Sequence, residues 1–315
     1  MTQTIEDIYP QWRRSTEAVG RLDKLFIVGC AKSGTTWLQN LLHAHPQMVV
    51  RGEGCFTYQL VPLLSQAFGA FNKHQHDKHP ITHMRDAELL LTARTLIDSQ
   101  FARYISESGK PASGLKVVGD KTPQHTISLP ALNQLYPNAR FINMIRDPRD
   151  VATSAWFHFG RNDPRGLEKY IRYFMTQVWP LNVSAPAQVA AQLGPRYRAI
   201  RYEDLHADEP GRTRSLLQFL GVDDSDAAVQ ACMAGGSFKK HSRGRERGQT
   251  DNDHFYRSGT VGDWQNHLPV ELVQACCDAI KPLMQQYGYE RARQTQANVL
   301  HHNARTAQAA MAARP

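Results

Sequence analysis

Short apolar runs alternate along the chain with longer stretches in which apolar residues recur at helical spacing. The apolar runs predict buried strands at residues 25–29, 48–50, 115–119, 140–145 and 197–202. The periodic stretches predict helices at residues 34–43, 87–105, 127–136, 148–159, 166–180, 210–220 and 269–287. Strands that alternate with helices are typical of a parallel sheet covered by helices on both faces. We therefore predict an α/β fold of three layers, with a central parallel β-sheet flanked by helices.

The chain carries no internal repeat and no obvious linker, so we predict a single domain over residues 1–290. Residues 239–254 are polar and basic and are expected to form a mobile loop. Residues 291–315 are rich in alanine, glutamine and arginine. This C-terminal tail is expected to be either helical or disordered.

Composition narrows the class of protein. A chain of 315 residues with 41% hydrophobic residues can bury a core, which excludes disorder by composition. The 37 Lys and Arg residues exceed the 29 Asp and Glu residues by eight, which favours anionic partners. The five cysteines are odd in number and form no C-x-x-C pair, so we expect reduced thiols and no metal site.

The N-terminus has no apolar core of the signal-peptide type. No apolar run approaches the ~20 residues that a membrane helix needs. We therefore expect a soluble, cytoplasmic protein without stable membrane insertion.

The segment GCAKSGTTW, residues 29–37, has the outline of a phosphate-binding loop, with four residues between Gly29 and Gly34. ATP- and GTP-binding loops place a lysine directly after the second glycine. This chain has Thr35 at that position, and its lysine, Lys32, lies inside the loop. Between a strand and a helix, the backbone N–H groups of such a loop converge on an anion, and hydroxyl side chains add donors. The alternative interpretation is a tight strand-to-helix turn without a ligand.

The loop sequence KSGTTW resembles the 5′-phosphosulfate loop of sulfotransferases that use 3′-phosphoadenosine-5′-phosphosulfate (PAPS), which have a P-loop-like fold. The resemblance implies that the nucleotide is bound by Lys32, Ser33, Gly34, Thr35, Thr36 and Trp37, the last by stacking on adenine. Lys32 would reach the oxygen that bridges the sulfuryl group and the leaving phosphate, and is therefore also a catalytic candidate. Because a monoanionic sulfuryl group needs less countercharge than a phosphoryl group, no metal is expected. For Trp37, a place in the core is the alternative.

A second match lies in residues 140–160, RFINMIRDPRDVATSAWFHFG. Arg146 follows a predicted strand, at the edge of a parallel sheet where ligands bind. The stretch resembles the family's 3′-phosphate motif, which implies that Arg146 and Ser154 bind that phosphate. The alternatives are an Arg–Asp pair that caps the next helix and a packing serine. Arg149 is expected to be solvated or paired with Asp150.

A third match, FYRSGTVGDWQNHL at residues 255–268, resembles the R-K-G-x-x-G-D-W-K segment of cytosolic sulfotransferases. It implies that Arg257, Ser258 and Gly259 hold the 3′-phosphate. Ser258 stands where the family usually has lysine, so one positive charge is missing. Trp264 of the same segment is expected to pack in the core.

Two more aromatic residues resemble adenine-contacting positions of the family. Tyr202 lies in RYEDL, and Phe238 lies in GGSFKKH. Aromatic faces can stack on a base. Ordinary packing is the alternative for both side chains.

A neutral acceptor alcohol must lose a proton during sulfuryl transfer, so the implied reaction needs a general base. Cytosolic members use a histidine in a K-[ST]-H motif, but this chain has GDKTPQH, with Pro123 at that position. The pattern is more similar to bacterial and Golgi-type relatives, which use a glutamate soon after the second strand. Glu53 fits that place and is the predicted base, with His125 as the rival and a salt bridge to Arg51 as the alternative. Lys121 is expected near the sulfuryl oxygens.

The sequence therefore predicts an enzyme that transfers a sulfuryl group from PAPS to a hydroxyl or amine, leaving 3′-phosphoadenosine-5′-phosphate (PAP). The expected acceptor is a small molecule, a glycan or a lipid, surrounded by residues 54–114, 166–193 and 239–254. Two other interpretations stay open, an ATP-dependent kinase and a non-enzymatic binder of polyanions or nucleic acid. We expect no nucleic-acid partner. The sequence leaves open a homodimer and the identity of the acceptor.

Overall fold

The computed structural model of the chain describes residues 4–75 and 80–289. The predicted tail at residues 291–315 lies outside the described residues. The chain groups into two compact units. The first unit is Met1–Ile145 with Asn182–His241, and the second is Arg146–Leu181 with Ser242–Pro315. The single domain over residues 1–290 stays a prediction.

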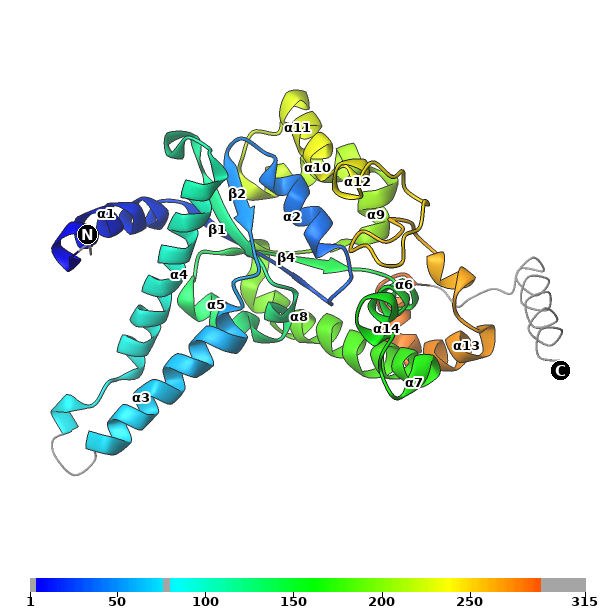
Figure 1. Ribbon diagram of the computed structural model, residues 1–315, viewed down its shortest axis with the longest axis horizontal. Helices are drawn as coiled ribbons and strands as arrows, with labels where there is room; N and C mark the ends of the chain where they lie inside the picture. Colours follow the sequence, from blue (N-terminus) through cyan, green and yellow to red (C-terminus); the bar gives the residue numbers. More distant parts are fainter. Residues whose placement is uncertain (1–3, 76–79, 290–315) are drawn as a thin grey trace. The chain divides into compact units, whose positions relative to one another are not determined.

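A parallel sheet of five strands, in the order β2-β3-β1-β4-β5, forms the centre of the first unit (Figure 1). The strands are β1 (Asp23–Gly29), β2 (Met48–Arg51), β3 (Val117–Lys121), β4 (Arg140–Ile145) and β5 (Tyr197–Arg201). Each strand pair is parallel, so the carboxyl ends of all five strands lie at one edge of the sheet. The five predicted strands and the predicted α/β fold are confirmed. Central strands of a parallel sheet are buried on both faces, which is why short apolar runs mark them.

Neighbouring residues of β1 face opposite layers of the first unit, as the two-residue period of a strand requires. Leu25 and Ile27 belong to a core cluster with residues of α2 (Thr35–His43), α10 (Glu209–Leu220) and α11 (Asp226–Gly236). Phe26 and Val28 belong to a second cluster with residues of α1 (Ile5–Gly20), α4 (Asp86–Ser108) and α5 (Leu129–Leu135). Shorter elements of this unit include the 3₁₀ turn η4 (Pro123–Ser128), α9 (Tyr202–Ala207) and α12 (Phe238–His241).

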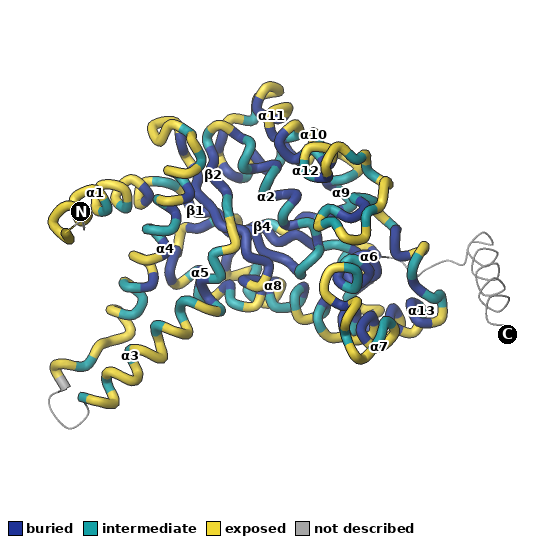
Figure 2. The backbone as a smooth tube through the Cα atoms, in the orientation of Figure 1, coloured by how far each residue is buried: buried dark blue, intermediate teal, exposed yellow. Residues whose placement is uncertain are grey.

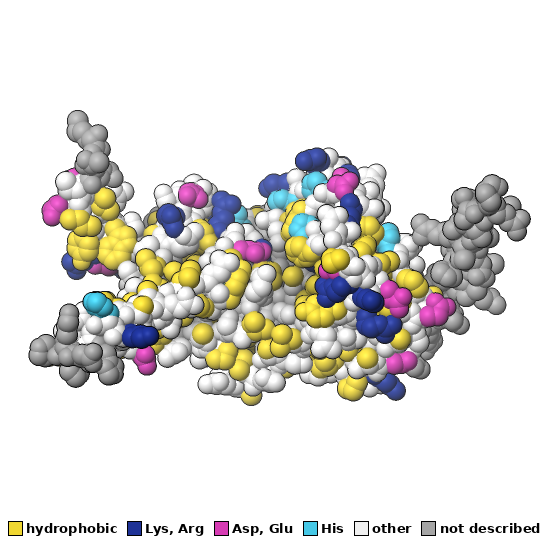
Figure 3. Space-filling model, turned by 60° about the horizontal axis from the view of Figure 1, so that its bottom comes forward, with side chains coloured by type: hydrophobic (Ala, Val, Ile, Leu, Met, Phe, Trp, Pro, Cys, Tyr) yellow, Lys and Arg dark blue, Asp and Glu magenta, His cyan; other side chains and the backbone are white. Residues whose placement is uncertain are grey.

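The sequence pattern did not predict α1, α3 (Val61–Gln75) or α11. Pro10 lies inside α1, and a proline argues against a helix when the sequence alone is considered. Within its described span, none of residues 61–75 of α3 is buried, so no buried face marks this helix (Figure 2). Leu63 of α3 is 62% exposed and Leu91 of α4 is 65% exposed. Figure 3 shows further apolar side chains on the surface.

Over the described residues 146–181 and 242–289, the second unit consists of helices and loops. Its helices are α6 (Pro148–Ala155), α7 (Gly166–Tyr173), α13 (Val270–Ala279), α14 (Lys281–Gln286) and the first residues of α8 (Trp179–Leu193). Helical turns over Trp156–Gly160 and Phe174–Val178 continue α6 and α7, in agreement with the predicted helices at 148–159 and 166–180. Arg245 is one of the side chains that hold the loop before α13. Arg245 donates to the carbonyl groups of Gln249, Tyr256 and Arg257, at 2.6, 2.6 and 2.8 Å.

Candidate functional site

The loop from Gly29 to Gly34 joins β1 to α2, and its backbone adopts positive φ angles that favour glycine. Gly29, Lys32 and Gly34 have φ values of 151°, 72° and 97°. A Cβ atom at Gly34 would lie 2.5 Å from Cδ2 of Tyr202, so a side chain at this position meets both strain and a ring. The strand-to-helix turn at residues 29–34 is therefore present in the first unit, and its role as a phosphate-binding loop stays a prediction.

Hydrogen bonds within the first unit close this loop. The backbone N–H and the hydroxyl of Ser33 both donate to the carbonyl of Cys30, at 3.0 and 2.6 Å. The N–H of Gly29 donates to Oγ1 of Thr126, which lies in η4, at 3.0 Å. The Ser33 hydroxyl proton is thus directed to the loop itself. Burial raises the pKa of the Cys30 thiol to about 12, so this side chain stays protonated at neutral pH.

The start of α2 fits an anion. Gly34 is the N-cap residue and has no side chain that could accept the first N–H groups of the helix. These N–H groups and the helix dipole favour a negative charge at this end. Lys32 and Thr36 are half-buried beside the helix start, and Thr35 is buried. The arrangement suits a phosphate or sulfate ester at the carboxyl edge of the sheet.

Trp37 and Tyr202, two of the three predicted adenine contacts, lie together in the first unit. Their ring centroids are 5.2 Å apart at an interplanar angle of 68°. Trp37 is 6% exposed and Tyr202 is 5% exposed, and both belong to the core cluster on the α2 side of the sheet. Phe238, the third, is also buried. All three side chains take part in packing, and their contact with adenine stays a prediction.

Glu53 and Lys121 form an ion pair at the carboxyl edge of the sheet, with 2.6 Å between Oε1 and Nζ. The Glu53 side chain is 39% exposed, whereas the Lys121 side chain is 6% exposed. Arg51, at the end of β2, pairs in register with Asp120 of β3. Gly52 approaches the Lys121 carbonyl so closely that a Cβ atom would collide with it. The turn after β2 therefore brings the predicted base onto the end of β3, with Lys121 and not Arg51 as its partner.

His125, the rival base, is enclosed. Its side chain is fully buried, and its ring stacks on Phe56 with 5.8 Å between centroids. Its Nε2 accepts the N–H of Thr57 at 3.4 Å. Burial lowers the pKa of His125 to about 3, so the ring is neutral at physiological pH. An acceptor hydroxyl could reach this nitrogen only after the packing is opened, and the structure favours Glu53 over His125.

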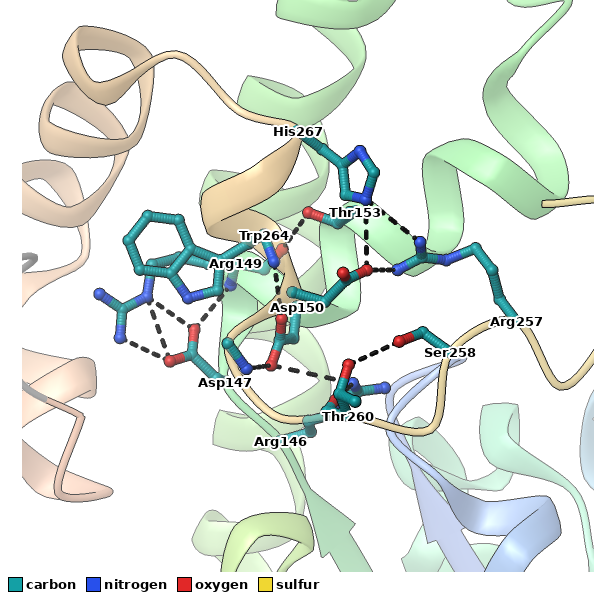
Figure 4. A network of polar contacts seen from close by, with 12 residues as sticks. Arg146, Asp147, Arg149, Asp150, Thr153, Arg257, Ser258, Thr260, Trp264 and His267 are labelled. Atoms are coloured by element: carbon teal, nitrogen blue, oxygen red, sulfur yellow. Dashed lines mark hydrogen bonds and ion pairs between the residues drawn. The ribbon is translucent and has the colours of Figure 1, made fainter. Parts of the chain in front are cut away.

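Arg146, in the second unit, directly follows the end of β4 in sequence. Its Nη2 donates to the Thr260 carbonyl at 2.9 Å and lies 3.8 Å from Oδ2 of Asp150 (Figure 4). Asp150 also accepts the N–H groups of Gly262 and Trp264, at 2.7 and 3.1 Å. Burial raises the pKa of Asp150, and the charge of Arg146 opposes that shift. Asp150 thereby joins α6 to the loop that carries the third sequence match.

The expectation for Arg149 is wrong. This side chain is buried and pairs with Asp147, with 2.5 Å between Nη2 and Oδ2. Asp147 is the N-cap of α6 and also accepts the N–H of Arg149 at 2.9 Å. The Arg149 guanidinium lies over the Trp264 ring at 4.5 Å from its centroid. Asp150 is already bound by the loop, and the predicted packing role of Trp264 is confirmed.

Arg257 lies in a cluster of polar and aromatic groups in the second unit. It forms a buried ion pair with Asp263, and its Nη1 lies 3.4 Å from Nε2 of His267 (Figure 4). The guanidinium also lies 4.7 Å from the centroid of the Phe157 ring. Burial alone would raise the pKa of Asp263, but the hydrogen bond from His267 and the charge of Arg257 together lower it. The cluster fixes the orientation of Arg257.

The remaining predicted 3′-phosphate residues lie near the same loop or on α6. The hydroxyl groups of Ser258 and Thr260 are hydrogen-bonded at 2.6 Å. Gly259 has a φ of 69°, in the left-handed region. Ser154 is half-buried on α6. Asp150 and Asp263 were not predicted from the sequence, although their place beside the predicted arginines in RDPRD and GDW was a usable signal.

Metal and membrane features are absent from the part of the chain that the structure describes. Among residues 4–75 and 80–289, no group of three or more His, Cys, Asp or Glu side chains is placed to hold a metal ion. Within those same ranges, every helix is too short or too polar to cross a membrane.

A family model described as "Sulfotransferase family" matches residues 24–226 of the chain. The nodulation protein NoeE of Sinorhizobium fredii is 26% identical over 295 residues, which cover 85% of this chain and 66% of that protein. Sulfotransferase 2A6 of Rattus norvegicus is 25% identical over 178 residues, which cover 51% of this chain and 61% of that protein. The chain thus spans less than two thirds of the length of these two relatives.

Two solved structures share the fold. Mouse sulfotransferase SULT7A1 complexed with PAP matches with a TM-score of 0.52 at 17% identity, covering 90% of this chain and 92% of that one. Retinol dehydratase in complex with androsterone and PAP matches with a TM-score of 0.50 at 19% identity, covering 91% and 88%. At these identities the likeness concerns the fold alone, and it confirms the predicted P-loop-like architecture.

Proposed function

The chain belongs to the sulfotransferase family, and on that premise we propose that it transfers a sulfuryl group from PAPS to a hydroxyl or amine, with PAP as the product. The observation that carries the proposal is the loop from Gly29 to Gly34, with its lysine inside the loop. This loop precedes the uncapped start of α2 at the carboxyl edge of the sheet, where α/β folds bind ligands.

We assign the donor's 5′-phosphosulfate to the loop. The N–H groups at the start of α2, with the hydroxyl groups of Thr35 and Thr36, supply hydrogen-bond donors to its oxygens. Lys32 supplies a positive charge to the oxygen on which charge develops when the sulfuryl group leaves. Ser33 contributes indirectly, because its hydroxyl donates to Cys30 and holds the loop closed.

We assign the 3′-phosphate to Arg146 and Arg257, with Ser154, Ser258 and Gly259 as further contacts. A guanidinium is planar and suits bidentate binding of a phosphate. Both arginines are oriented by buried carboxylates within the second unit. Adenine is assigned to the aromatic residues Trp37, Tyr202 and Phe238.

Glu53 is the proposed general base. Its carboxylate is the exposed member of the pair with Lys121. In the proposed step, the acceptor oxygen forms a bond to sulfur and its proton passes to Glu53. The bond between sulfur and the 5′-phosphate oxygen breaks, and PAP leaves with the electron pair.

A kinase is not favoured, because Thr35 stands where an ATP-binding loop has its lysine. We extend the proposal to an acceptor that is a small molecule, a glycan or a lipid. The homodimer and the absence of a metal stay predictions.

Ligand-dependent thermal unfolding tests the proposal. PAP should raise the melting temperature more than ADP, AMP or ATP with Mg²⁺, because a ligand at 100 times its Kd stabilises by about 2.7 kcal/mol. PAPS should then be converted to PAP when an acceptor is supplied. Equal stabilisation by PAP and ADP would remove the 3′-phosphate assignment, and preferential stabilisation by ATP with Mg²⁺ would support a kinase instead.

A further inference from the structure

Asp120 is a fully buried carboxylate next to Lys121, and it binds the turn that carries Glu53. Its Oδ2 accepts the N–H of Gly54 at 2.9 Å and the hydroxyl of Tyr104 at 3.2 Å. Its Oδ1 accepts the hydroxyl of Thr122 at 2.7 Å. Three donors from three segments of the first unit therefore meet on one side chain.

Thr122 extends this contact along the same turn. Its Oγ1 accepts the N–H of Cys55 at 3.3 Å while its proton is donated to Asp120. Farther along, the N–H of Thr57 is bound by His125. The backbone N–H groups that follow Glu53 are thus anchored on the end of β3 and the residues after it. The turn after β2 has no strand partner of its own beyond Arg51, so these bonds decide where it lies.

We propose that Asp120 is a positioning residue that acts through Glu53, by holding the Gly54 N–H directly and the Cys55 N–H through Thr122. This inference rests on the proposed function, because it concerns the base of that reaction. A general base must lie within hydrogen-bond reach of the proton that it takes. Glu53 is about two-fifths exposed, so apart from its ion pair with Lys121 its own packing does not hold it, and the backbone beneath it must be fixed.

A carboxylate suits this task better than a neutral side chain. The hydroxyl groups of Tyr104 and Thr122 can rotate, but the backbone N–H of Gly54 has a fixed direction. This N–H therefore needs an acceptor that is always available. A carboxylate offers two acceptor oxygens, whereas an asparagine offers one oxygen and one NH₂ group. Burying a charge is unfavourable unless hydrogen bonds compensate it, and the three donors supply that compensation. Burial raises the pKa of Asp120 to about 6, so the carboxylate form prevails at neutral pH.

Hydrogen–deuterium exchange of the unliganded protein tests the anchoring itself. Asp120→Asn and Thr122→Val should each speed exchange in residues 52–57 by roughly fivefold or more. A hydrogen-bonded N–H exchanges only after its hydrogen bond breaks, and both substitutions weaken such bonds in this turn. Asp98→Asn is the matched control. Asp98 lies on α4, accepts the hydroxyl of Tyr136 at 2.9 Å and does not contact this turn. Unchanged exchange at residues 52–57 in both test variants would overturn the proposal.

Turnover tests the consequence, with PAPS as the donor and water as the acceptor, measured as release of PAP. Asp120→Asn should lower kcat by about 10- to 100-fold, the scale of a misplaced catalytic group, while thermal stabilisation by PAP stays unchanged. In a Glu53→Gln background the same substitution should have no further effect, because the base is already absent. A full additional loss in that background would contradict action through Glu53. If the wild-type protein releases no PAP and is also stabilised equally by PAP and ADP, the proposed function fails, and the exchange experiment still decides the anchoring.

Discussion

Nζ of Lys121 lies 2.6 Å from Oε1 of Glu53, and the glutamate is the exposed member of the pair. If this carboxylate is the base, Glu53→Gln should lower kcat for sulfuryl transfer by about 10²- to 10⁴-fold. Binding of PAP should stay unchanged, because Glu53 is assigned to the acceptor side. Glu107→Gln, an exposed glutamate on α4, is the control and should retain turnover. Full activity of the Glu53 variant would transfer the role of base to another residue.

Arg146 should determine the preference for a 3′-phosphate. Loss of a charge-assisted hydrogen bond of about 1.5–3 kcal/mol predicts that Arg146→Ala weakens PAP about 10- to 100-fold. Affinity for ADP, which has no 3′-phosphate, should change much less. Titration calorimetry with both nucleotides measures the ratio. Arg172→Ala, an exposed arginine paired with Glu168, serves as the control, and an equal loss for PAP and ADP would refute the assignment.

Gly34 should not tolerate a side chain. Its φ is 97°, and a Cβ atom there would lie 2.5 Å from the Tyr202 ring, so Gly34→Ala should destabilise the protein by more than about 1 kcal/mol. Gly20→Ala is the matched control, because a Cβ atom there meets no heavy atom within 4 Å. Urea denaturation should show a lower midpoint for the first variant alone. Equal midpoints would mean that the loop relaxes without strain.

The pH dependence of stability should reveal Asp120. Burial raises its pKa from 3.8 to about 6, against the hydrogen bonds from Thr122 and Gly54 and the charge of Lys121. The folded state therefore keeps the proton up to about pH 6, while the unfolded state loses it near pH 4. The contribution of Asp120 to the free energy of unfolding is therefore fully present below pH 4 and is lost as the pH rises to 6. The free energy of unfolding falls by at most about 1.4 kcal/mol per pH unit in this range.

Asparagine at position 120 removes this titration, so the comparison of wild type with Asp120→Asn isolates it. The neighbouring His125, whose Nδ1 lies 3.8 Å from Asp120, is present in both proteins. The unfolding free energy of the wild type relative to the variant should fall between pH 4 and pH 6, as measured by urea denaturation. A flat or rising difference would show that Asp120 is already ionised in the folded protein at pH 4.

The strands and the conformation of the glycine turn at residues 29–34 could be predicted because their causes are local. A strand buried on both faces must be an apolar run, and the left-handed backbone at Gly34 requires a residue without a side chain. The position of Glu53 could be predicted only by resemblance. Its pairing with Lys121 depends on the register of β2 against β3, which no local pattern specifies.

Other features depend on contacts between distant segments. Two carboxylates, Asp147 and Asp150, lie close to Arg149 in sequence. The N–H groups of Gly262 and Trp264 bind Asp150, and Arg149 pairs with Asp147. The enclosure of His125 comes from Phe56, almost 70 positions earlier. The helix α3 lacks a buried face, so the periodic signal on which a helix prediction depends is weak.

The alternation along β1 has a consequence for the evolution of the chain. Leu25 and Ile27 serve one hydrophobic layer while Phe26 and Val28 serve the other, so a shift of one residue would exchange the contents of both layers. Deletion or insertion of a single codon in this strand is therefore opposed on two sides at once. Gly29 is the next residue and ends β1. The same constraint therefore keeps the start of the glycine turn at a fixed position along the carboxyl edge of the sheet when the surrounding sequence changes.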